Sequence, residues 1–249
     1  MTQEFEGPRT AIVTGGAKRI GEALVRALAA DGWHVLIHYN RSGEAAGRLA
    51  AEIGNAAIVQ AELGGADCAE RIMAAVGGLP PARLLVNSAS QFLNDGAGDF
   101  TAAQWDMHQA VNARAPALLT QAFAARMGEG NGLIVNMLDA KLAAPNPDFY
   151  SYTVSKMALA GLTELSARAL APRIRVCGIA PSVTMVSGPQ SRDNFDKVHK
   201  LNALGRGVEA SQIVEALRFI IASPTMTGQT ITLDAGQRFL SLPRDVQYL

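Results

Sequence analysis

Short apolar runs alternate with longer amphipathic segments along most of the chain. The runs span four to seven residues, which is typical of strands that are buried on both faces of a sheet. The longer segments are apolar on one side only, as in 22–30, where Leu24, Val25, Leu28 and Ala29 share a side. The predicted strands are 10–13, 33–39, 57–60, 83–86, 133–137, 174–179 and 229–233, and the predicted helices are 22–30, 44–53, 68–76, 101–127, 148–170 and 210–221.

This alternation predicts an α/β fold with right-handed crossovers. We expect residues 1–249 to form a single Rossmann-type domain, a doubly wound parallel β-sheet of about seven strands with helices on both faces. Ligands of such sheets bind at the carboxyl ends of the strands. The polar residues that follow each predicted strand are therefore the candidate site. The irregular segment 182–207, which lacks a core pattern, is predicted to be a substrate-binding loop.

The first predicted strand runs directly into a glycine-rich turn before the first helix. Glycines there let the backbone approach a pyrophosphate, and the helix N-terminus offers free N–H groups. The glycines stand at 15, 16 and 21, so the spacing differs from the usual Gly-x-Gly-x-x-Gly. Arg19 occupies a place where such loops often have a third glycine. The turn predicts a dinucleotide site.

The residues after the second strand favour NADPH over NADH. An acidic residue is expected there if the ribose 2′-hydroxyl of NAD is bound, but the chain has Arg41 followed by Ser42. A guanidinium suits a 2′-phosphate, which a carboxylate would repel. The alternative is that Arg41 is an ordinary solvated loop cation. Glu62 and Leu63, after the third strand, could border the adenine.

Tyr152 and Lys156 stand four residues apart on the predicted helix 148–170 and therefore share one face. An ammonium beside a phenol lowers the pKa of the tyrosine, so that Tyr152 could exchange a proton near neutral pH. The alternative is an exposed pair with no function. Asp139 follows the fifth strand. Pro116 should kink the helix 101–127 and free a backbone carbonyl near Asn112 to hold a water.

Composition narrows the function further. The formal net charge is zero and 49% of the residues are apolar, so we expect no nucleic-acid or membrane partner. Cys68 and Cys177 are far apart and the N-terminus has no secretion signal, which predicts a cytoplasmic protein. The histidines have no metal-ligand spacing, so no metal is expected. The apolar remainder of helix 148–170, including Leu162 and Leu165, predicts a homo-oligomer, with core packing as the alternative.

Several motifs resemble those of the short-chain dehydrogenase/reductases along nearly the whole chain. They are Thr14-Gly15 with Gly21, the turn Asn87-Ser88-Ala89-Ser90, Asn112, Tyr152-xxx-Lys156 and Thr227-Gly228. Within that family the chain is most similar to pteridine reductases and to reductases of the dihydromonapterin or dihydrofolate type. That similarity rests on Lys18-Arg19-Ile20-Gly21, His38-Tyr39-Asn40-Arg41-Ser42, Ser90-Gln91-Phe92 and Asn136-Met137-Leu138-Asp139.

The resemblance implies roles for individual residues, and we expect the homo-oligomer to be a homotetramer. Tyr152 would donate the proton, Lys156 would lower its pKa and bind the nicotinamide ribose, and Asn112 would hold a water that links Lys156 to solvent. The implied cofactor contacts are Gly15, Arg19, Ile20, Gly21, Arg41, Ser42, Glu62, Leu63, Asn87, Ser88, Ala89, Tyr152, Lys156, Pro181 and Val183. The implied substrate contacts are Arg19, Ser90, Phe92, Asp139 and Tyr152, with Phe92 stacked on a flat pterin-like ring.

Three positions depart from the family pattern. The usual Asn-Asn-Ala-Gly turn is Asn87-Ser88-Ala89-Ser90, the usual Pro-Gly is Pro181-Ser182, and the usual serine thirteen residues before the tyrosine is Asp139. An ionised aspartate has no proton to donate to the alkoxide that forms when a ketone is reduced. A C=N bond instead needs a proton on nitrogen, which a carboxylate beside Tyr152 can relay.

We therefore expect an NADPH-dependent reductase that transfers hydride to the C=N bond of a pterin- or dihydrofolate-like substrate. Two alternatives remain at this point. If Asp139 is held protonated by burial or is turned away, the enzyme would be a carbonyl reductase, for instance of 3-oxoacyl thioesters. The departures at Ser182 and in the Asn87 turn also allow a protein that binds NADPH without catalysis.

Overall fold

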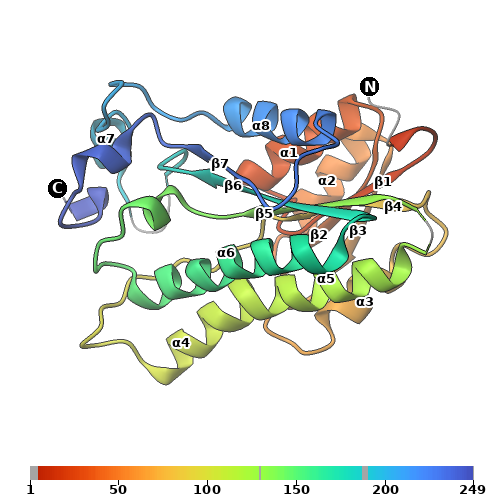
Figure 1. The fold of residues 1–249 in the computed structure, drawn as a ribbon, viewed down its shortest axis with the longest axis horizontal. Coiled ribbons are helices and arrows are strands. Elements are labelled where there is room, and N and C mark those ends of the chain that lie inside the picture. Colours follow the sequence, from red (N-terminus) through yellow and green to blue (C-terminus); the bar gives the residue numbers. More distant parts are fainter. Residues whose placement is uncertain (1–4, 129, 187–189, 249) are drawn as a thin grey trace.

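A computed structural model describes residues 5–128, 130–186 and 190–248. Seven strands form one parallel sheet with the order β3-β2-β1-β4-β5-β6-β7 (Figure 1). The predicted Rossmann-type α/β class and the number of strands are thus confirmed. The strands are β1 (Thr10–Val13), β2 (His34–Tyr39), β3 (Ala56–Gln60), β4 (Ala82–Asn87), β5 (Gly132–Met137), β6 (Ile174–Pro181) and β7 (Thr230–Leu233).

Helices cover both faces of the sheet. One face carries α1, α2 and α8, and the other carries α3, α5 and α6, with α4 beside α6 (Figure 1). The helices are α1 (Arg19–Ala30), α2 (Gly43–Ile53), α3 (Cys68–Ala74), α4 (Ala102–Gln109), α5 (Ala115–Arg126), α6 (Tyr150–Leu170), α7 (Arg192–Val198) and α8 (Ala210–Ala222). Short 3-10 turns follow at Ala140–Ala143, Gln237–Leu240 and Val246–Tyr248.

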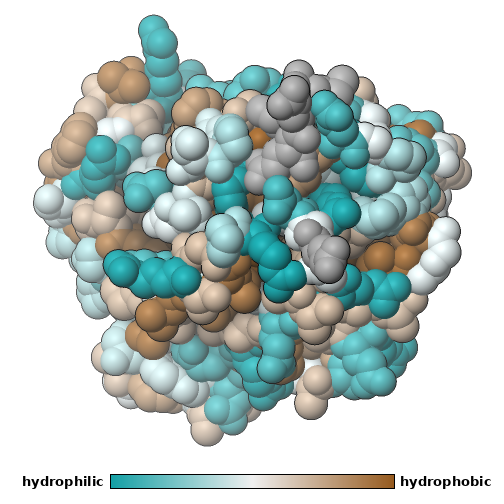
Figure 2. Space-filling view, turned by 45° about the vertical axis from the view of Figure 1, so that its right-hand side comes forward, coloured by the Kyte–Doolittle hydropathy of each residue, from teal (hydrophilic) through white to brown (hydrophobic). Residues whose placement is uncertain are grey.

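The sheet separates two hydrophobic clusters, as its continuous apolar runs require. In β1, Ala11 and Val13 belong to the cluster under α1, α2 and α8, whereas Ile12 belongs to the cluster with α3 and α5. On the face that Figure 2 shows, hydrophilic residues are interspersed with small apolar areas. Among the described residues, no helix has both the length and the apolar character needed to cross a membrane.

The structure differs from the predicted elements at two places. The predicted helix 101–127 is interrupted by a π-helical turn, Ala110–Arg114, in which the Ala115 N–H bonds the carbonyl five residues earlier. Pro116 follows this turn and lacks the N–H that an uninterrupted α-helix would need. The segment 182–207, predicted as irregular, contains the helix α7, whose Phe195 and Val198 are buried. Residues 187–189 of that segment lie outside the described residues.

Candidate active site

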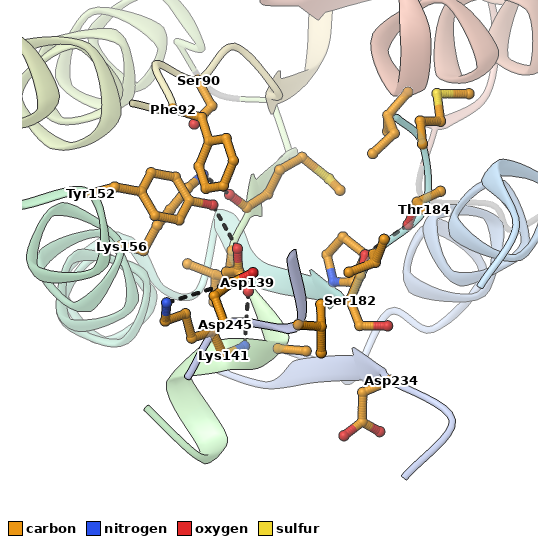
Figure 3. Close-up of a pocket in the computed structure, with 18 of the residues that line it drawn as sticks. Ser90, Phe92, Asp139, Lys141, Tyr152, Lys156, Ser182, Thr184, Asp234 and Asp245 are labelled. Carbon is orange, nitrogen blue, oxygen red and sulfur yellow. Dashed lines mark hydrogen bonds and ion pairs between the residues drawn. The ribbon is translucent and has the colours of Figure 1, made fainter. Parts of the chain in front are cut away.

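A cavity of about 600 Å³ opens at the carboxyl edge of the sheet. It is bounded by the residues that follow β1, β4, β5, β6 and β7, together with the first turns of α6 (Figure 3). Most of the predicted site residues line it. These are Gly15, Arg19, Ile20, Gly21, Ser88, Ala89, Ser90, Phe92, Asp139, Tyr152, Lys156, Pro181 and Val183. Arg41, Ser42, Glu62, Leu63, Asn87 and Asn112 are not among the lining residues.

The glycine-rich turn forms a backbone cradle at one end of this cavity. Gly15 has a φ of +64°, and a Cβ added at Gly21 would lie 2.2 Å from the Gly15 carbonyl oxygen. The Thr14 hydroxyl accepts hydrogen bonds of 3.0 Å from the N–H groups of Ser88 and Ala89. This hydroxyl therefore joins the first turn to the turn after β4. Arg19, at the place of the missing third glycine, has a left-handed φ of +57°.

His38 supports the cradle from behind, a role that the sequence did not reveal. The Gly15 N–H donates to His38 Nδ1 at 3.1 Å, and His38 Nε2 lies 3.0 Å from the Ala61 carbonyl oxygen. A backbone N–H can only donate, so Nδ1 is the acceptor and Nε2 carries the hydrogen. Burial lowers the pKa of His38, which keeps the ring neutral in this arrangement.

The predicted 2′-phosphate residues lie at the end of β2, beyond the cavity lining. The Arg41 side chain is exposed, and no hydrogen bond or ion pair joins it to another described residue. Its neighbour Asn40 donates to Glu62 Oε2 at 2.5 Å, which joins the ends of β2 and β3. Arg19 reaches across the cavity mouth and donates to the Val186 carbonyl oxygen at 2.6 Å.

The three predicted chemical groups converge inside the cavity. The Tyr152 hydroxyl donates to Asp139 Oδ2 at 2.6 Å, and Asp139 Oδ1 accepts from the Lys141 N–H at 2.8 Å (Figure 3). Lys156 Nζ donates to the Met137 carbonyl oxygen at 2.7 Å and lies 5.7 Å from the centroid of the Tyr152 ring. The carboxyl group therefore contacts the phenol directly, whereas the ammonium lies beside the ring.

The expected lowering of the Tyr152 pKa is wrong for this arrangement. The pKa of Tyr152 is raised well above its ordinary value, first by burial and then by the charge and hydrogen bond of Asp139. Burial also raises the pKa of Asp139, against the opposing effects of Tyr152, the Lys141 N–H and Lys156. Burial lowers the pKa of Lys156 to about 8. After burial, Asp139 has the larger effect on the pKa of the phenol, because its carboxyl group is within hydrogen-bond distance and the Lys156 ammonium is not.

Asn112 contacts the site through its side chain. Its Oδ1 accepts from the Gln91 N–H at 2.8 Å, and its Nδ2 donates to the Gln91 carbonyl oxygen at 2.9 Å and to Ser155 Oγ at 2.9 Å. It thus fixes the turn after β4 to α6. The predicted water at its backbone carbonyl stays a prediction.

Aromatic rings form one side of the cavity. Phe92 stacks on Phe149 with centroids 4.2 Å apart and meets the edge of Tyr152 at 4.7 Å and 81°. Phe92 therefore lies beside the phenol, as a stacking residue for a flat ring would (Figure 3).

The C-terminal segment supplies a wall that the sequence analysis did not predict. Leu242, Asp245, Val246 and Gln247 line the cavity, and Lys141 Nζ lies 3.3 Å from Asp245 Oδ2. A second pair tethers the same segment, because Arg244 donates to Asp148 at 2.7 Å and the Asp245 N–H donates to the same carboxylate at 2.7 Å. These residues follow β7 at the carboxyl edge of the sheet. They therefore also follow the rule that ligands of parallel sheets bind at the carboxyl ends of the strands.

Comparisons with known proteins agree with this geometry. Residues 9–196 match the family model described as short chain dehydrogenase. FolM alternative dihydrofolate reductase 1 from Brucella suis, solved in complex with NADP, has a TM-score of 0.89 and 40% identity, covering 93% of this chain and 95% of that one.

Two curated relatives align over nearly their whole length. Pteridine reductase 1 from Leishmania tarentolae is 31% identical, covering 95% of this chain and 98% of that protein. A 3-oxoacyl-[acyl-carrier-protein] reductase from Synechocystis is 27% identical, covering 92% and 96%.

Proposed function

The chain belongs to the short-chain dehydrogenase family, and we propose that it is an NADPH-dependent reductase that transfers hydride to the C=N bond of a pterin- or dihydrofolate-like substrate. The observation that carries this proposal is the hydrogen bond of 2.6 Å between the Tyr152 hydroxyl and Asp139 in the cavity. The similarity to FolM dihydrofolate reductase 1 and to pteridine reductase 1 supports the substrate class.

The residues present fit NADPH. Gly15 and Gly21 approach each other so closely that only backbone borders this end of the cavity, where such folds bind a pyrophosphate. Lys18 and Arg19 add positive charge there. Arg41 and Ser42 would hold the 2′-phosphate, and Glu62 and Leu63 would border the adenine. The remaining parts of the cofactor would be surrounded by Ile20, Asn87, Ser88, Ala89, Pro181 and Val183. Bound NADPH would supply the hydride that reduces the carbon of the C=N bond.

The chain's own residues handle the proton. Tyr152 would deliver its hydroxyl proton to the substrate nitrogen, and Asp139, after taking up a proton, would return it to the phenolate across their hydrogen bond. Asp139 lines the cavity, so it can be reprotonated from there. The ammonium of Lys156 offsets the negative charge left on this pair and would also bind the nicotinamide ribose. Asn112 would hold the water that connects Lys156 to solvent.

Substrate recognition would use the face of Phe92 together with Ser90 and Arg19, all of which line the cavity. Residues 182–207 would form the substrate-binding segment, of which Ser182, Val183, Thr184 and Met185 line the cavity. A carbonyl reductase is the second candidate, because burial raises the pKa of Asp139 and a protonated carboxyl group could donate to a carbonyl oxygen.

A substrate comparison tests the proposal. NADPH oxidation is followed with dihydrofolate, a dihydropterin and a 3-oxoacyl thioester, using Tyr152→Phe as the inactive control. A higher kcat/KM for dihydrofolate and the dihydropterin than for the 3-oxoacyl thioester supports the proposal. Turnover of the thioester alone would contradict it. Tight binding of NADPH without turnover of any substrate would identify a non-catalytic binding protein.

We also propose a cytoplasmic homotetramer in which α6 faces a second copy. Met157 and Leu165 are exposed on α6, at 45% and 67% of their surfaces. Light scattering of Leu165→Lys tests this assembly, with Leu204→Lys as a control, since Leu204 is equally exposed outside α6. Dissociation by both variants, or by neither, contradicts an interface on α6.

A further inference from the structure

Three polar side chains are buried together beside the cavity without lining it. Asp95, His108 and Ser151 expose 6%, 0% and 0% of their surfaces, and the proton transfer described above uses none of them. Burying polar groups is unfavourable unless each forms hydrogen bonds. The arrangement of their hydrogen bonds therefore shows what the cluster holds in place.

The hydrogen bonds of this cluster run in one direction. The Leu93 N–H donates to His108 Nε2 at 3.1 Å, so Nε2 is unprotonated and the neutral ring carries its hydrogen on Nδ1. His108 Nδ1 then donates to Ser151 Oγ at 2.6 Å, and the Ser151 hydroxyl donates to Asp95 Oδ2. Burial lowers the pKa of His108, which agrees with a neutral ring.

Asp95 also caps the helix that carries Tyr152. The N-cap residue of α6, Phe149, makes no side-chain cap hydrogen bond. The loop after β4 replaces it, because the Ser151 N–H donates to Asp95 Oδ1 at 2.9 Å and the Tyr150 N–H donates to the Asp95 carbonyl oxygen at 3.0 Å. A carboxyl group at a helix N-terminus bonds otherwise unpaired N–H groups and faces the positive end of the dipole.

The two connected segments carry the two rings of the cavity. Phe92 immediately precedes Leu93, and Tyr152 immediately follows Ser151, so the cluster joins the neighbours of both rings. The rings meet edge to face at 4.7 Å (Figure 3). On the other side of Phe92, Asn112 holds both backbone groups of Gln91. The backbone is therefore fixed on each side of Phe92.

We propose that Asp95, His108 and Ser151 are positioning residues that hold Phe92 beside Tyr152 as a preformed platform for a planar substrate ring. This inference rests on the proposed function, in which Phe92 stacks on the substrate. A platform fixed before binding avoids the entropy cost of ordering it when the ring arrives. The cluster should therefore affect KM more than kcat.

A double-mutant cycle between Ser151→Ala and Phe92→Ala tests the coupling. Ser151→Ala should raise KM about tenfold and leave the Kd for NADPH within about twofold. In the Phe92→Ala background the same change should raise KM by less than about twofold, since the platform is already absent. KM effects that multiply would overturn the positioning role.

Matched variants separate positioning from stability. Ser166→Ala removes another buried hydroxyl from α6, far from Phe92, and should leave KM unchanged. His108→Gln keeps an acceptor for the Leu93 N–H and should bring KM closer to the wild-type value than His108→Leu does. Equal KM values for the two His108 variants would overturn the proposal. So would a rise in KM with Ser166→Ala as large as the rise with Ser151→Ala.

A measurement without substrate keeps the two proposals distinguishable. Hydrogen exchange of the Leu93 amide should accelerate in Ser151→Ala and stay slow in Ser166→Ala. Unchanged exchange in Ser151→Ala overturns the positioning role even if no substrate is turned over. Absence of pterin and dihydrofolate turnover in the wild type overturns the proposed function instead.

Discussion

The Tyr152 hydroxyl donates a hydrogen bond of 2.6 Å to Asp139 Oδ2. The phenol and the carboxyl group therefore act as one proton-holding unit, and removal of a proton from either one alters the other. A serine at position 139 could donate a hydrogen bond but could not store a proton near neutral pH. Whether the cavity favours reduction of a C=N bond or of a carbonyl group therefore depends on having aspartate rather than serine at position 139.

The first prediction concerns that unit. Asp139→Ser should lower kcat/KM for dihydrofolate or dihydropterin by about 100-fold, because the proton relay to Tyr152 is lost. Turnover of a 3-oxoacyl thioester should be retained. Both rates are measured by NADPH oxidation, with Asp106→Ser as the control, since Asp106 is exposed on α4. Unchanged dihydropterin reduction would show that Asp139 takes no part in the reaction.

The second prediction concerns the buried ammonium of Lys156. Its pKa in the folded protein is about 8, against 10.5 ordinarily, chiefly because of burial. Between these values the unfolded chain binds more protons, so the free energy of unfolding rises with pH from about 8 to about 10.5. Relative to Lys156→Met, this rise should amount to about 3 kcal/mol.

Urea unfolding at a series of pH values measures that rise. Lys200→Met is the control, because Lys200 is exposed and should leave the wild-type pH dependence unchanged. Parallel curves for the wild type and Lys156→Met would mean that the ammonium is not destabilised by burial.

Cofactor preference gives the third prediction. Arg41→Ala should weaken NADPH binding by about 1–3 kcal/mol, the value of a charge-assisted hydrogen bond, and leave NADH binding nearly unchanged. Arg48→Ala is the matched control, because Arg48 is an exposed arginine already paired with Glu44. Titration calorimetry measures the dissociation constants of both cofactors for the wild type and for each of the two variants. Equal weakening of both cofactors would show that Arg41 does not contact the phosphate.

The fourth prediction concerns Gly21. A methyl group there would collide with the Gly15 carbonyl oxygen, so Gly21→Ala should lower the free energy of unfolding by about 2–3 kcal/mol and weaken NADPH binding. Gly47 lies in α2 with open space around it, and Gly47→Ala should stabilise the fold by about 0.5–1 kcal/mol. Chemical denaturation compares the two variants. Similar effects in both would contradict the close contact of the first turn.

The C-terminal wall provides the fifth prediction. Lys141 and Asp245 expose only 9% and 15% of their side chains, so Lys141→Met strands a poorly hydrated carboxylate and should lower the free energy of unfolding by about 3 kcal/mol. Arg244→Ala leaves the Asp148 carboxylate, 12% exposed, with its hydrogen bond from the Asp245 N–H, and should lower the free energy of unfolding by less, about 1–2 kcal/mol. Thermal denaturation ranks the two, and the reverse order would contradict this account.

Much of the site follows from one rule applied to the sequence. Because parallel strands end at one edge of the sheet, Gly15, Asp139 and Pro181 had to lie near one another. The helical spacing of Tyr152 and Lys156 placed both on the inner face of α6.

Other features depend on distances that no pattern contains. The pKa of Tyr152 is raised first by the burial of its hydroxyl and then by contact with Asp139, and the spacing of Tyr152 and Lys156 shows neither. Lys141 and Asp245 meet only because the chain after β7 returns to the segment after β5. Asp95 precedes α4 in an irregular loop, so its capping of α6 had no signature in the sequence.

The π-helical turn Ala110–Arg114 determines which side chains of the following helix α5 face the sheet. Each residue turns a helix by about 100°, so a deletion inside this turn would swing Leu119 and Phe123 away from the sheet. At positions other than Asn112, the chain should therefore tolerate substitutions in this turn far better than changes in its length. Insertions and deletions in deep mutational libraries would show that asymmetry.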